Sequence, residues 1–414
     1  MSSPPENPDK PQVRVYQLRA TSDTSITQPP PYTEVSHEQP PTRLSSPPPP
    51  PPEDTSNWKR YVFIIIVGCA LILGGVLGGL IPSKSSKQSN YSRVEYRLID
   101  TYPASTFFNH FTFFTAPDPT HGFVTYQSRA ASESQDLTFY HALPQNSTTL
   151  PLTLPQPNNT SPESQTSAIL RVSTAPLAHN ATGRPSVRIA STRTYNTTTL
   201  FLFSILHTPH GCGTWPALWL LGPKWPAGGE IDVLEAVNKG DTGNSMTLHT
   251  ARGCTMSSQR SRRHLGTAKT WDCWNATNWN AGCGVQGQQE TYGEVFNANG
   301  GGLYAVEVRD EGIRVWMFGE RDVPGDVRSG TPDPSIWGLP LAEFPGAQCE
   351  VGKFFRDLRI VVNIGLCGDW AGAPGVYEEG AKCSGKCEDW VRNHGESFEE
   401  AYWEFGGFWV FKSE

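Results

Sequence analysis

Hydrophobic residues divide the chain into three parts. Residues 1–60 contain 15 of the 36 prolines, including the run Pro47–Pro52, and almost no large apolar side chains. Such a segment cannot bury a core, so we predict a disordered, Pro-rich tail with some polyproline II character. The run Tyr61–Ile81 is apolar throughout. After a linker at residues 82–91, residues 92–414 show short apolar runs separated by turn residues.

Tyr61–Ile81 has the length of a transmembrane helix. At 1.5 Å per residue, a helix of this length spans roughly 30 Å, the thickness of a bilayer's hydrocarbon core. Sixty residues precede it, which is too many for the short basic leader of a cleaved signal peptide. We therefore predict a retained signal anchor. Paired glycines at 74–75 and 78–79 permit close helix contact, although many single spans contain such glycines without dimerising.

The orientation of the span is indicated by the residues that follow it. Lysines and arginines flank the span on both sides, so the positive-inside rule does not decide. All Asn-x-Ser/Thr sequences and eight of the nine cysteines lie after the span, which indicates glycosylation and disulfides in an oxidising compartment. We predict a single-pass type II membrane protein whose C-terminal domain, residues 92–414, is extracellular or luminal. The seven glycosylation sequences start at Asn90, Asn146, Asn158, Asn159, Asn180, Asn196 and Asn275.

The cysteines have a second interpretation as metal ligands. Cys383 and Cys387 have roughly the spacing of a zinc site, but no second pair with its own histidines follows. Disulfides are therefore the preferred interpretation, and the sequence does not choose among the many possible connectivities. The eight residues are Cys212, Cys254, Cys273, Cys283, Cys349, Cys367, Cys383 and Cys387, whereas Cys69 lies in the predicted span.

Residues 92–414 have the pattern of one β-rich domain. Runs of strand length recur between turn residues, as an all-β sandwich requires, and no long amphipathic helix is predicted. The clearest hairpin turns at Arg309–Gly312, with glycine where a positive φ is expected. The predicted strands include Val187–Ala190, Leu200–Leu206, Ile231–Val237, Leu303–Val308, Ile313–Phe318, Leu358–Ile364 and Phe408–Phe411.

Three carboxylates, Glu230, Asp232 and Glu235, lie within six residues of an apolar, β-branched run. Side chains alternate between the two faces of a strand, so Glu235 should point away from the other two. One extra residue, a β-bulge at Val233 or Leu234, returns Glu235 to their face. We therefore predict a bulged strand with all three acids facing one space.

Such a set suits glycoside hydrolysis. Retaining enzymes use two carboxyl groups about 5–5.5 Å apart as nucleophile and acid/base, whereas inverting enzymes separate them by about 6.5–9.5 Å to admit water. Carboxylates on one strand segment lie close together, so we predict retention. Asp232 between the glutamates disfavours ionisation of all three, which keeps one carboxyl protonated as the acid. The alternative is a solvated acidic strand edge.

The surrounding sequence resembles a known family. Thr214–Gly222 contains Trp-Pro-Ala-Leu-Trp, Glu230–Glu235 has the form Glu-x-Asp-x-x-Glu, and Thr247–Thr250 is Thr-Leu-His-Thr. These motifs are similar to the signature of the fungal laminarinase-like branch of family 16 glycoside hydrolases. Further matching segments are Phe107–Phe114, Asp118–Gly122, Tyr292–Asn297, Gly300–Gly302, Pro332–Gly338, Cys367–Gly372 and Ala401–Trp403.

This resemblance implies a concanavalin-like β-jelly roll with a groove across its concave sheet, and hydrolysis of β-1,3- or mixed β-1,3/1,4-glucan. By position, Glu230 matches the family's nucleophile, Glu235 its general acid/base and Asp232 an assisting residue between them. His249 resembles a histidine that lines the same site, although a histidine satisfied within the sandwich is the alternative. Many relatives have Ile-Ile-Glu-Gly where this chain has Val233–Ala236, which keeps the apolar character.

Aromatic residues near these motifs predict a sugar-binding groove, because the apolar faces of pyranose rings stack on indoles. We expect Trp219, Trp225 and Trp370 to contact the substrate, and Trp215 to be buried. Arg188 is a further candidate from an adjacent strand, with a structural or surface role as the alternative.

Other partners follow from charge and short motifs. The net charge is −7 and no dense basic patch indicates nucleic acid. No calcium-binding loop is recognisable, so we predict no metal and no required cofactor. Pro29–Tyr32 has the form of a ligand for WW domains, with a plain flexible tail as the alternative.

The sequence thus predicts a membrane-anchored, retaining endo-β-glucanase that acts on cell-wall glucan. A transglycosylase would use the same residues, with a sugar hydroxyl in place of water. A glucan-binding or wall-sensing membrane protein without catalysis is the third hypothesis, which the loss of either glutamate would have favoured.

Overall fold

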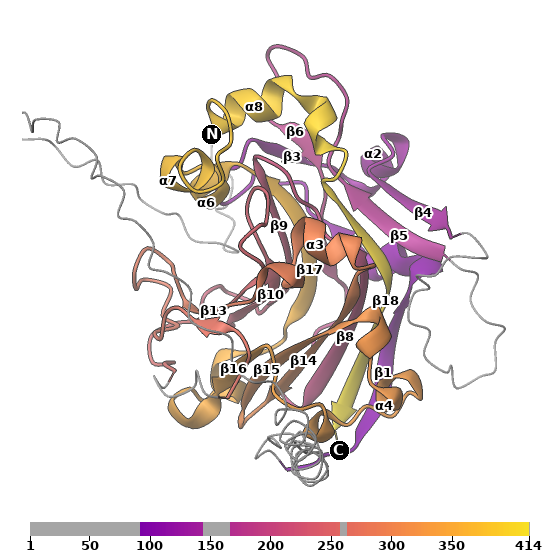
Figure 1. Ribbon diagram of the computed structural model, residues 1–414, viewed down its shortest axis with the longest axis vertical. Coiled ribbons are helices and arrows are strands. Elements are labelled where there is room, and N and C mark those ends of the chain that lie inside the picture. The colour runs from indigo at the N-terminus through magenta and orange to yellow at the C-terminus, as the bar shows by residue number, and fades with distance from the viewer. Residues whose placement is uncertain (1–91, 144–165, 257–262, 414) are drawn as a thin grey trace, which may run out of the picture. The chain divides into compact units, whose positions relative to one another are not determined.

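Two antiparallel β-sheets stacked face to face form the body of the protein (Figure 1). The computed structural model describes residues 92–143, 166–256 and 263–413. All of these belong to one compact unit. The Pro-rich tail, the motif Pro29–Tyr32, the run Tyr61–Ile81 and Cys69 lie outside the described residues. Within the described residues, no helix has the length and apolarity needed to cross a membrane.

The first sheet, sheet A, has eight strands in the order β16-β15-β14-β8-β18-β5-β4, with β1 paired to β18. Its longest strand, β18, forms the end of the described chain and pairs with three others. The strands are β1 (Tyr96–Pro103), β4 (Thr138–Ala142), β5 (Thr166–Arg171), β8 (Thr199–His207), β14 (Gly302–Arg309), β15 (Gly312–Gly319), β16 (Ala342–Pro345) and β18 (Tyr402–Ser413).

The second sheet, sheet B, also has eight strands, in the order β12-β13-β11-β10-β9-β17-β7-β2. Its strands are β2 (Phe111–Phe113), β7 (Arg188–Ser191), β9 (Thr214–Leu221), β10 (Glu230–Glu235), β11 (Ser245–His249), β12 (Thr267–Ala268), β13 (Cys283–Gln286) and β17 (Arg359–Leu366). A short parallel pair, β3 (Val124–Tyr126) and β6 (Arg184–Ser186), stands apart from both sheets.

Helices in the described residues are short and lie in the connections between strands. The longest α-helix, α8, has seven residues. The α-helices are α2 (Arg129–Ser134), α3 (Gly293–Ala298), α4 (Gly325–Arg328), α5 (Val351–Phe354), α6 (Gly368–Ala371), α7 (Pro374–Tyr377) and α8 (Cys387–Asn393). The 3-10 helices are η1 (Ala104–His110), η3 (Gln289–Thr291), η4 (Glu320–Asp322), η5 (Pro334–Ile336), η6 (Gly346–Gln348) and η7 (Gly395–Phe398).

The main core lies between the sheets and follows the alternation of side chains along each strand. In β8, Phe201 and Phe203 face this core, whereas Leu200 and Leu202 belong to a second cluster with Trp316 on the opposite face of sheet A. Because both faces of β8 are covered, its sequence is almost continuously apolar rather than alternating. The predicted all-β sandwich is therefore confirmed. Six of the seven predicted strands lie within two residues of their expected ends, whereas the last, β18, begins at Tyr402, six residues before the predicted start at Phe408.

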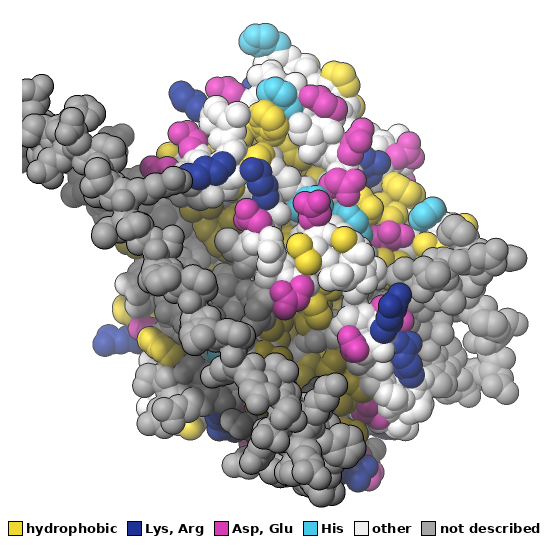
Figure 2. Space-filling model, viewed as in Figure 1, with side chains coloured by type: hydrophobic (Ala, Val, Ile, Leu, Met, Phe, Trp, Pro, Cys, Tyr) yellow, Lys and Arg dark blue, Asp and Glu magenta, His cyan; other side chains and the backbone are white. Residues whose placement is uncertain are grey.

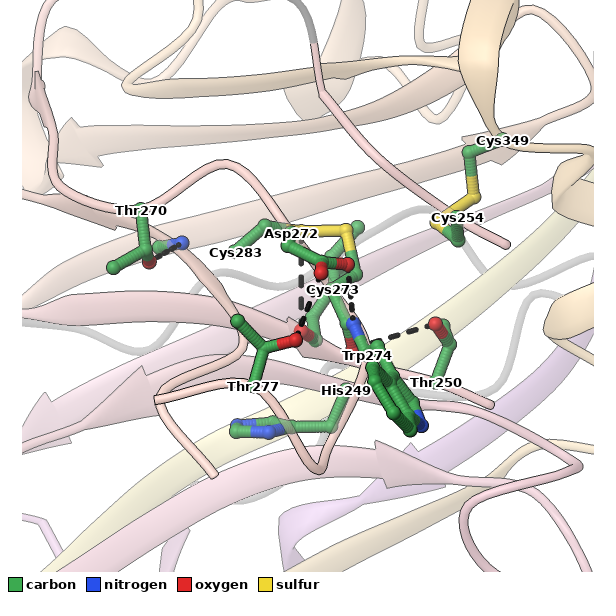
Figure 3. Close-up of a disulfide and its surroundings, with 12 residues drawn as sticks. His249, Thr250, Cys254, Thr270, Asp272, Cys273, Trp274, Thr277, Cys283 and Cys349 are labelled. Atoms are coloured by element: carbon green, nitrogen blue, oxygen red, sulfur yellow. Dashed lines mark hydrogen bonds between the residues drawn. A yellow bond between two sulfur atoms is a disulfide. The ribbon is translucent and has the colours of Figure 1, made fainter. Parts of the chain in front are cut away.

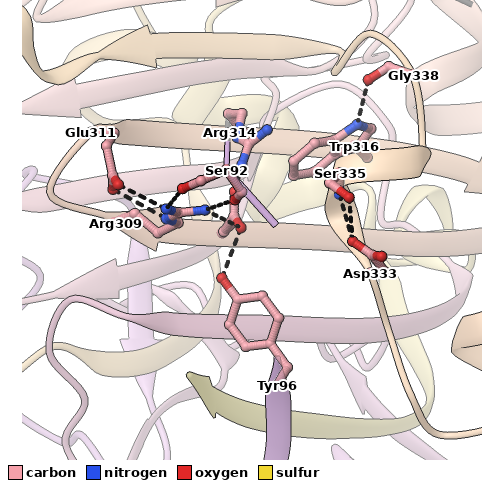
Figure 4. Close-up of polar contacts among 10 residues, drawn as sticks. Ser92, Tyr96, Arg309, Glu311, Arg314, Trp316, Asp333, Ser335 and Gly338 are labelled. Carbon is pink, nitrogen blue, oxygen red and sulfur yellow. Dashed lines mark hydrogen bonds and ion pairs between the residues drawn. The ribbon is translucent and has the colours of Figure 1, made fainter. Parts of the chain in front are cut away.

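A buried ionic cluster joins the first strand to the hairpin of β14 and β15 (Figure 4). The hydroxyl of Tyr96 donates to Glu307 over 2.7 Å, and the Arg314 guanidinium pairs with the same carboxylate. Arg309 donates to the carbonyl oxygen of Ser92 over 2.9 Å and also binds Glu311. Burying Glu307 is tolerable because its charge is paired and hydrogen-bonded. The cluster therefore fixes the beginning of the described chain against sheet A.

All eight cysteines after the predicted span form disulfides, as expected. Neither Cys383 nor Cys387 is available to a metal, because they pair with Cys212 and Cys367 respectively. The other bonds are Cys254–Cys349 and Cys273–Cys283.

The surface visible in Figure 2 carries acidic and basic side chains interspersed, and its described part shows no broad area of one sign.

Candidate active site

A β-bulge in the central strand of sheet B brings the three predicted acids to one face. In the pairing of β10 with β9, Asp232 lies opposite Trp219 and Leu234 lies opposite Leu218, so Val233 has no opposite residue. Val233 and Leu234, although adjacent, both belong to the core between the sheets. The predicted bulge is confirmed, at Val233. Its consequence is that Glu230, Asp232 and Glu235 all point away from the core.

Asn244 holds the backbone of this bulge. Its side-chain oxygen accepts the N–H of Glu235 over 2.9 Å, and its amide nitrogen donates to the carbonyl oxygen of Val233 over 2.7 Å. Asn244 is fully buried, and its own N–H donates to Thr291. One side chain thus satisfies both backbone groups that the extra residue removes from the β-ladder. Sequence reasoning missed Asn244, since nothing in its local sequence signals this contact.

The strand begins at a backbone position that favours glycine. Gly229 has φ 78°, and a Cβ there would lie 2.3 Å from the carbonyl oxygen of Phe354. No other residue fits without displacing the neighbouring chain. Gly229 therefore sets the direction in which Glu230 enters the sheet.

Each of the two glutamates accepts a hydrogen bond from an indole. Nε1 of Trp215 donates to Oε1 of Glu235 over 2.7 Å, and Nε1 of Trp225 donates to Oε2 of Glu230. Both glutamates are buried. Each indole N–H therefore provides a fixed donor that holds its carboxylate in one orientation. The expectation that Trp215 is buried is wrong, because its side chain is partly exposed and lines the cavity described below.

His249 pairs with the middle acid. Its Nε2 lies 3.3 Å from Oδ2 of Asp232, and its Nδ1 lies 3.1 Å from Oδ1 of Asn280. Burial alone would lower the pKa of His249, but the hydrogen bond and charge of Asp232, with the charges of Glu230 and Glu235, outweigh it, so the pKa is raised. The structure thus places His249 in the site, as predicted, with a partner that favours its protonated form.

A cavity of about 440 Å³ opens over these acids. Glu230, Glu235, His249 and Trp370 line it. A small hollow lies next to this cavity, and Trp215 lines both of them. A third hollow, of about 670 Å³, lies over β2, β7 and β17, and Arg188 lines both it and the small hollow. The hollows therefore follow one another across the face of sheet B that carries the acids, which gives an extended ligand room on both sides of them.

The other predicted binding residues take different positions along these hollows. Trp370 lies on α6 and meets the ring of Trp215 edge to face, with 5.7 Å between the ring centroids. Arg188 lies over the rings of Phe114 and Trp219 at 4.4 and 5.2 Å. Trp219 is only 1% exposed, and its indole N–H donates to Asn363. An indole so enclosed has no open face for a sugar ring, so the structure favours a supporting position for Trp219 beneath the groove.

A disulfide-closed loop forms one wall of the cavity (Figure 3). Cys273 pairs with Cys283, and between them Asn278, Trp279 and Asn280 have φ values of 46°, 59° and 66°. Three successive left-handed residues are unusual, because only glycine and, less readily, asparagine adopt this region. Trp279 is 75% exposed at the cavity. Sequence reasoning missed this wall, because the left-handed run depends on a disulfide that the cysteine count could not assign.

Two carboxylates fixed in an open groove are the arrangement that glycoside hydrolases use. Comparison with known proteins identifies the family: residues 111–411 match the family described as "XgeA-like, catalytic GH16 domain". The chain belongs to glycoside hydrolase family 16, as the sequence motifs indicated.

Curated relatives carry glycosidase names. A probable glycosidase of Schizosaccharomyces pombe is 40% identical over 330 residues, which are 79% of this chain and 71% of that protein. An endo-1,3(4)-β-glucanase of Arthroderma benhamiae is 36% identical over 77% of this chain and 65% of its own length. A probable endo-1,3(4)-β-glucanase of Aspergillus clavatus is 32% identical over 83% of this chain, and the match spans half of its own length.

Solved structures of the family share the fold. Laminarinase 16A from Phanerochaete chrysosporium, with β-glucans in its donor and acceptor sites, is 38% identical with a TM-score of 0.67, over 77% of this chain and all of that one. An elongating family 16 β-1,3-glucosyltransferase is 35% identical with a TM-score of 0.66, again over 77% of this chain and all of the other.

We predict that Asn244→Ala destabilises the domain and misplaces Glu235. The substitution leaves two buried backbone groups unsatisfied, at about 1–3 kcal/mol each, and a shift of about 1 Å in a reacting group can cost about 10²-fold in rate. Urea unfolding and kcat/KM on glucan, measured well below the unfolding temperature, check both effects. Asn299→Ala, which alters an exposed asparagine, serves as the control. Equal stability of the Asn244 variant and the parent would contradict the assigned clamp.

We predict that the imidazole of His249 titrates above its ordinary pKa of about 6.5 and that Asp232→Asn lowers this pKa. Because the folded pKa is raised, the stabilisation from the pair is fully present below the unfolded pKa and is lost as the pH rises through the folded one. NMR titration of the histidine ring protons measures this. His207, whose pKa burial lowers, is the internal control and should not respond. An unchanged His249 titration in Asp232→Asn would show that Asp232 is not its partner.

Proposed function

We propose that the protein is a retaining endo-β-glucanase that cleaves β-1,3- or mixed β-1,3/1,4-glucan of the kind found in cell walls. The observation that carries the proposal is the pair Glu230 and Glu235 on one face of a bulged strand, each held by an indole N–H. The names of the relatives support the substrate class. Hollows on both sides of the acids suit cleavage within a long chain.

Glu230 acts as the nucleophile in this proposal. The hydrogen bond from Trp225 holds this carboxylate in place in the groove, where it attacks the anomeric carbon. Glu235 first donates a proton to the leaving glycosidic oxygen, and its carboxylate then takes a proton from the water that releases the covalent glycosyl-enzyme. Trp215 donates to Oε1 of Glu235, which holds the carboxyl group in place for both proton transfers.

Asp232 and His249 support this pair without reacting. Asp232 lies between the two glutamates on the same strand face, and its contact with His249 spreads its negative charge away from them. A protonated His249 thereby reduces the repulsion that three neighbouring carboxylates would otherwise impose on the site.

Glucan transfer is the second candidate, favoured by the likeness to an elongating β-1,3-glucosyltransferase. In transfer, the hydroxyl of an acceptor sugar replaces water in the second step, and Glu235 deprotonates it. The exposed indole of Trp279 at the cavity wall would offer an acceptor sugar a stacking surface.

We predict that Glu230→Gln abolishes cleavage of laminarin and lichenan, and that Glu235→Gln lowers the rate by about 10²–10⁴-fold, the usual contribution of general acid–base catalysis. The measurement uses the full chain in detergent and follows products by chromatography and their anomeric configuration by NMR. Retention gives β-anomers first. Glu350→Gln, which alters an exposed surface pair, is the matched control.

The outcomes separate the hypotheses. First-formed α-anomers would refute retention, and products longer than the starting oligosaccharide would assign transfer. A folded parent that binds laminarin without cleaving or transferring it would refute both catalytic proposals in favour of a glucan-binding protein.

We also propose that the chain is a type II membrane protein anchored by Tyr61–Ile81, with its catalytic domain extracellular or luminal. The four disulfides support this orientation, because such bonds persist in oxidising compartments. The motif Pro29–Tyr32 would then face the cytoplasm, where WW domains could reach it.

The orientation predicts that the sequences starting at Asn180 and Asn196, both exposed, carry N-glycans. Endoglycosidase treatment of the membrane-bound protein should increase its gel mobility, and Asn196→Gln should remove part of the shift. In sealed vesicles, protease added to the cytoplasmic side should shorten only the N-terminal tail. Degradation of the catalytic domain from that side would disprove the orientation.

A further inference from the structure

A second cluster of titratable side chains lies at the end of sheet A, outside the active site. His207 ends β8, His210 lies in the following loop and Glu400 lies just before β18. Each offers one nitrogen or oxygen atom, and these atoms lie within 4.8 Å of one another. In Figure 2, histidine and acidic side chains gather at the surface near α3.

The hydrogen bonds of His207 indicate where its proton lies. Nδ1 is 2.9 Å from the carbonyl oxygen of Tyr402, which can only accept, so Nδ1 carries the proton. Nε2 lies 2.9 Å from the side-chain amide of Asn297. The orientation of that amide is fixed, because its oxygen accepts the N–H of Thr208 over 2.8 Å. Asn297 therefore directs an N–H at Nε2, which must present its lone pair.

Glu400 faces the same lone pair. Its Oε2 lies 3.0 Å from Nε2 of His207. A carboxylate oxygen and an imidazole lone pair repel each other unless a proton or a cation lies between them. A proton on Nε2 would relieve that repulsion but would oppose the amide N–H of Asn297. A bound cation resolves the repulsion without protonating the ring.

The geometry around the histidines is that of metal ligands. Ligating histidines commonly donate their other ring N–H to a backbone carbonyl, which fixes the ring, and His207 does so to Tyr402. Its ring also stacks on the ring of Tyr402 at 3.7 Å and 6°. Neighbouring ligands of tetrahedral zinc are about 3.3 Å apart, close to the observed separation of His207 and Glu400. The N–H of His210 donates to the backbone oxygen of Glu400 over 3.2 Å, which holds the third ligand nearby.

We propose that His207, His210 and Glu400 bind one divalent transition-metal ion, with zinc as the natural candidate and water as the fourth ligand. Imidazole ligands favour zinc over calcium and magnesium, which prefer sets of oxygen atoms. The side chain of Glu400 is 60% exposed, so the site opens to solvent and takes up metal after folding. When the ion binds, the Asn297 amide loses its hydrogen bond to Nε2 of His207 and keeps its hydrogen bond to the carbonyl oxygen of Thr208.

The ion would join β8, its following loop and the start of β18. The loop leads directly to the active site: Gly211 donates to Asn238, whose side chain donates to Ala371 beside Trp370. The same loop continues into Trp215, the donor to Glu235. In this proposal the ion stabilises the loop that leads to the catalytic groove, and it takes no part in the chemistry.

The test compares the full chain in detergent with two variants, His210→Ala and Glu400→Gln, which alter partly or fully exposed residues and should leave the fold intact by circular dichroism. His141→Ala is the matched control, since His141 also pairs with a glutamate, Glu404, at 3.4 Å but belongs to no group of three metal-binding side chains among the described residues. After treatment with a chelator, each protein is titrated with Zn²⁺ against a competing dye, with Co²⁺ as a visible-spectrum probe and with Ca²⁺ for comparison.

The expected result is one Zn²⁺ per parent chain, a histidine-type Co²⁺ spectrum and a higher unfolding temperature with Zn²⁺ but not with Ca²⁺. His210→Ala and Glu400→Gln should each weaken Zn²⁺ binding at least tenfold, whereas His141→Ala should not. Absence of Zn²⁺ binding by the parent, or equal binding by His210→Ala, would overturn the proposal. Because binding is measured directly, either outcome is independent of whether the protein cleaves glucan.

Discussion

The extra residue at Val233 is the constraint on which the active site depends. A regular strand would bury Glu235 in the core, where an unpaired carboxylate costs several kcal/mol or takes up a proton. The bulge instead turns Val233 and Leu234 into the core and returns Glu235 to the groove. Its cost is two backbone groups without ladder partners, and Asn244 satisfies both. The catalytic geometry and the stability of sheet B are therefore coupled through one amide.

The environment of the acids then divides their tasks. Indole N–H groups fix one oxygen of each glutamate, and Asp232 is paired with His249. These donors come from β9, from the loop before β10 and from β11. Sheet pairing brings them together, since His249 lies opposite Glu230 in the register of β10 and β11. Because these donors are fixed by the sheet, the carboxylates are held in their orientation before substrate binds.

The parts of the molecule that can be predicted from the sequence are those encoded by short-range patterns. Alternation and turn residues predict the sandwich, and the spacing of Glu230, Asp232 and Glu235 by itself requires a bulge if the acids are to share a face. Asn244 and the loop bearing Trp279 cannot be found in this way, because their positions depend on contacts with the bulge and on the Cys273–Cys283 bond. The different exposures of Trp215 and Trp219 could not be predicted for a related reason. Alternation places both on one face of β9 but cannot show that Arg188 lies over Trp219.

The buried histidines His249 and His207, each beside a carboxylate, differ in the position of one proton. At His249, Nε2 meets Asp232 while Nδ1 meets an amide oxygen, so both nitrogens face acceptors and the ring gains stability by protonation. At His207, the N–H at Nδ1 donates to a backbone carbonyl oxygen and an amide N–H donates to Nε2. The ring is therefore neutral beside Glu400. The first arrangement attracts a proton and the second a metal ion, although both begin as a buried imidazole beside a carboxylate. The chemistry of each site is therefore decided by the other hydrogen-bond partners of the imidazole rather than by the carboxylate.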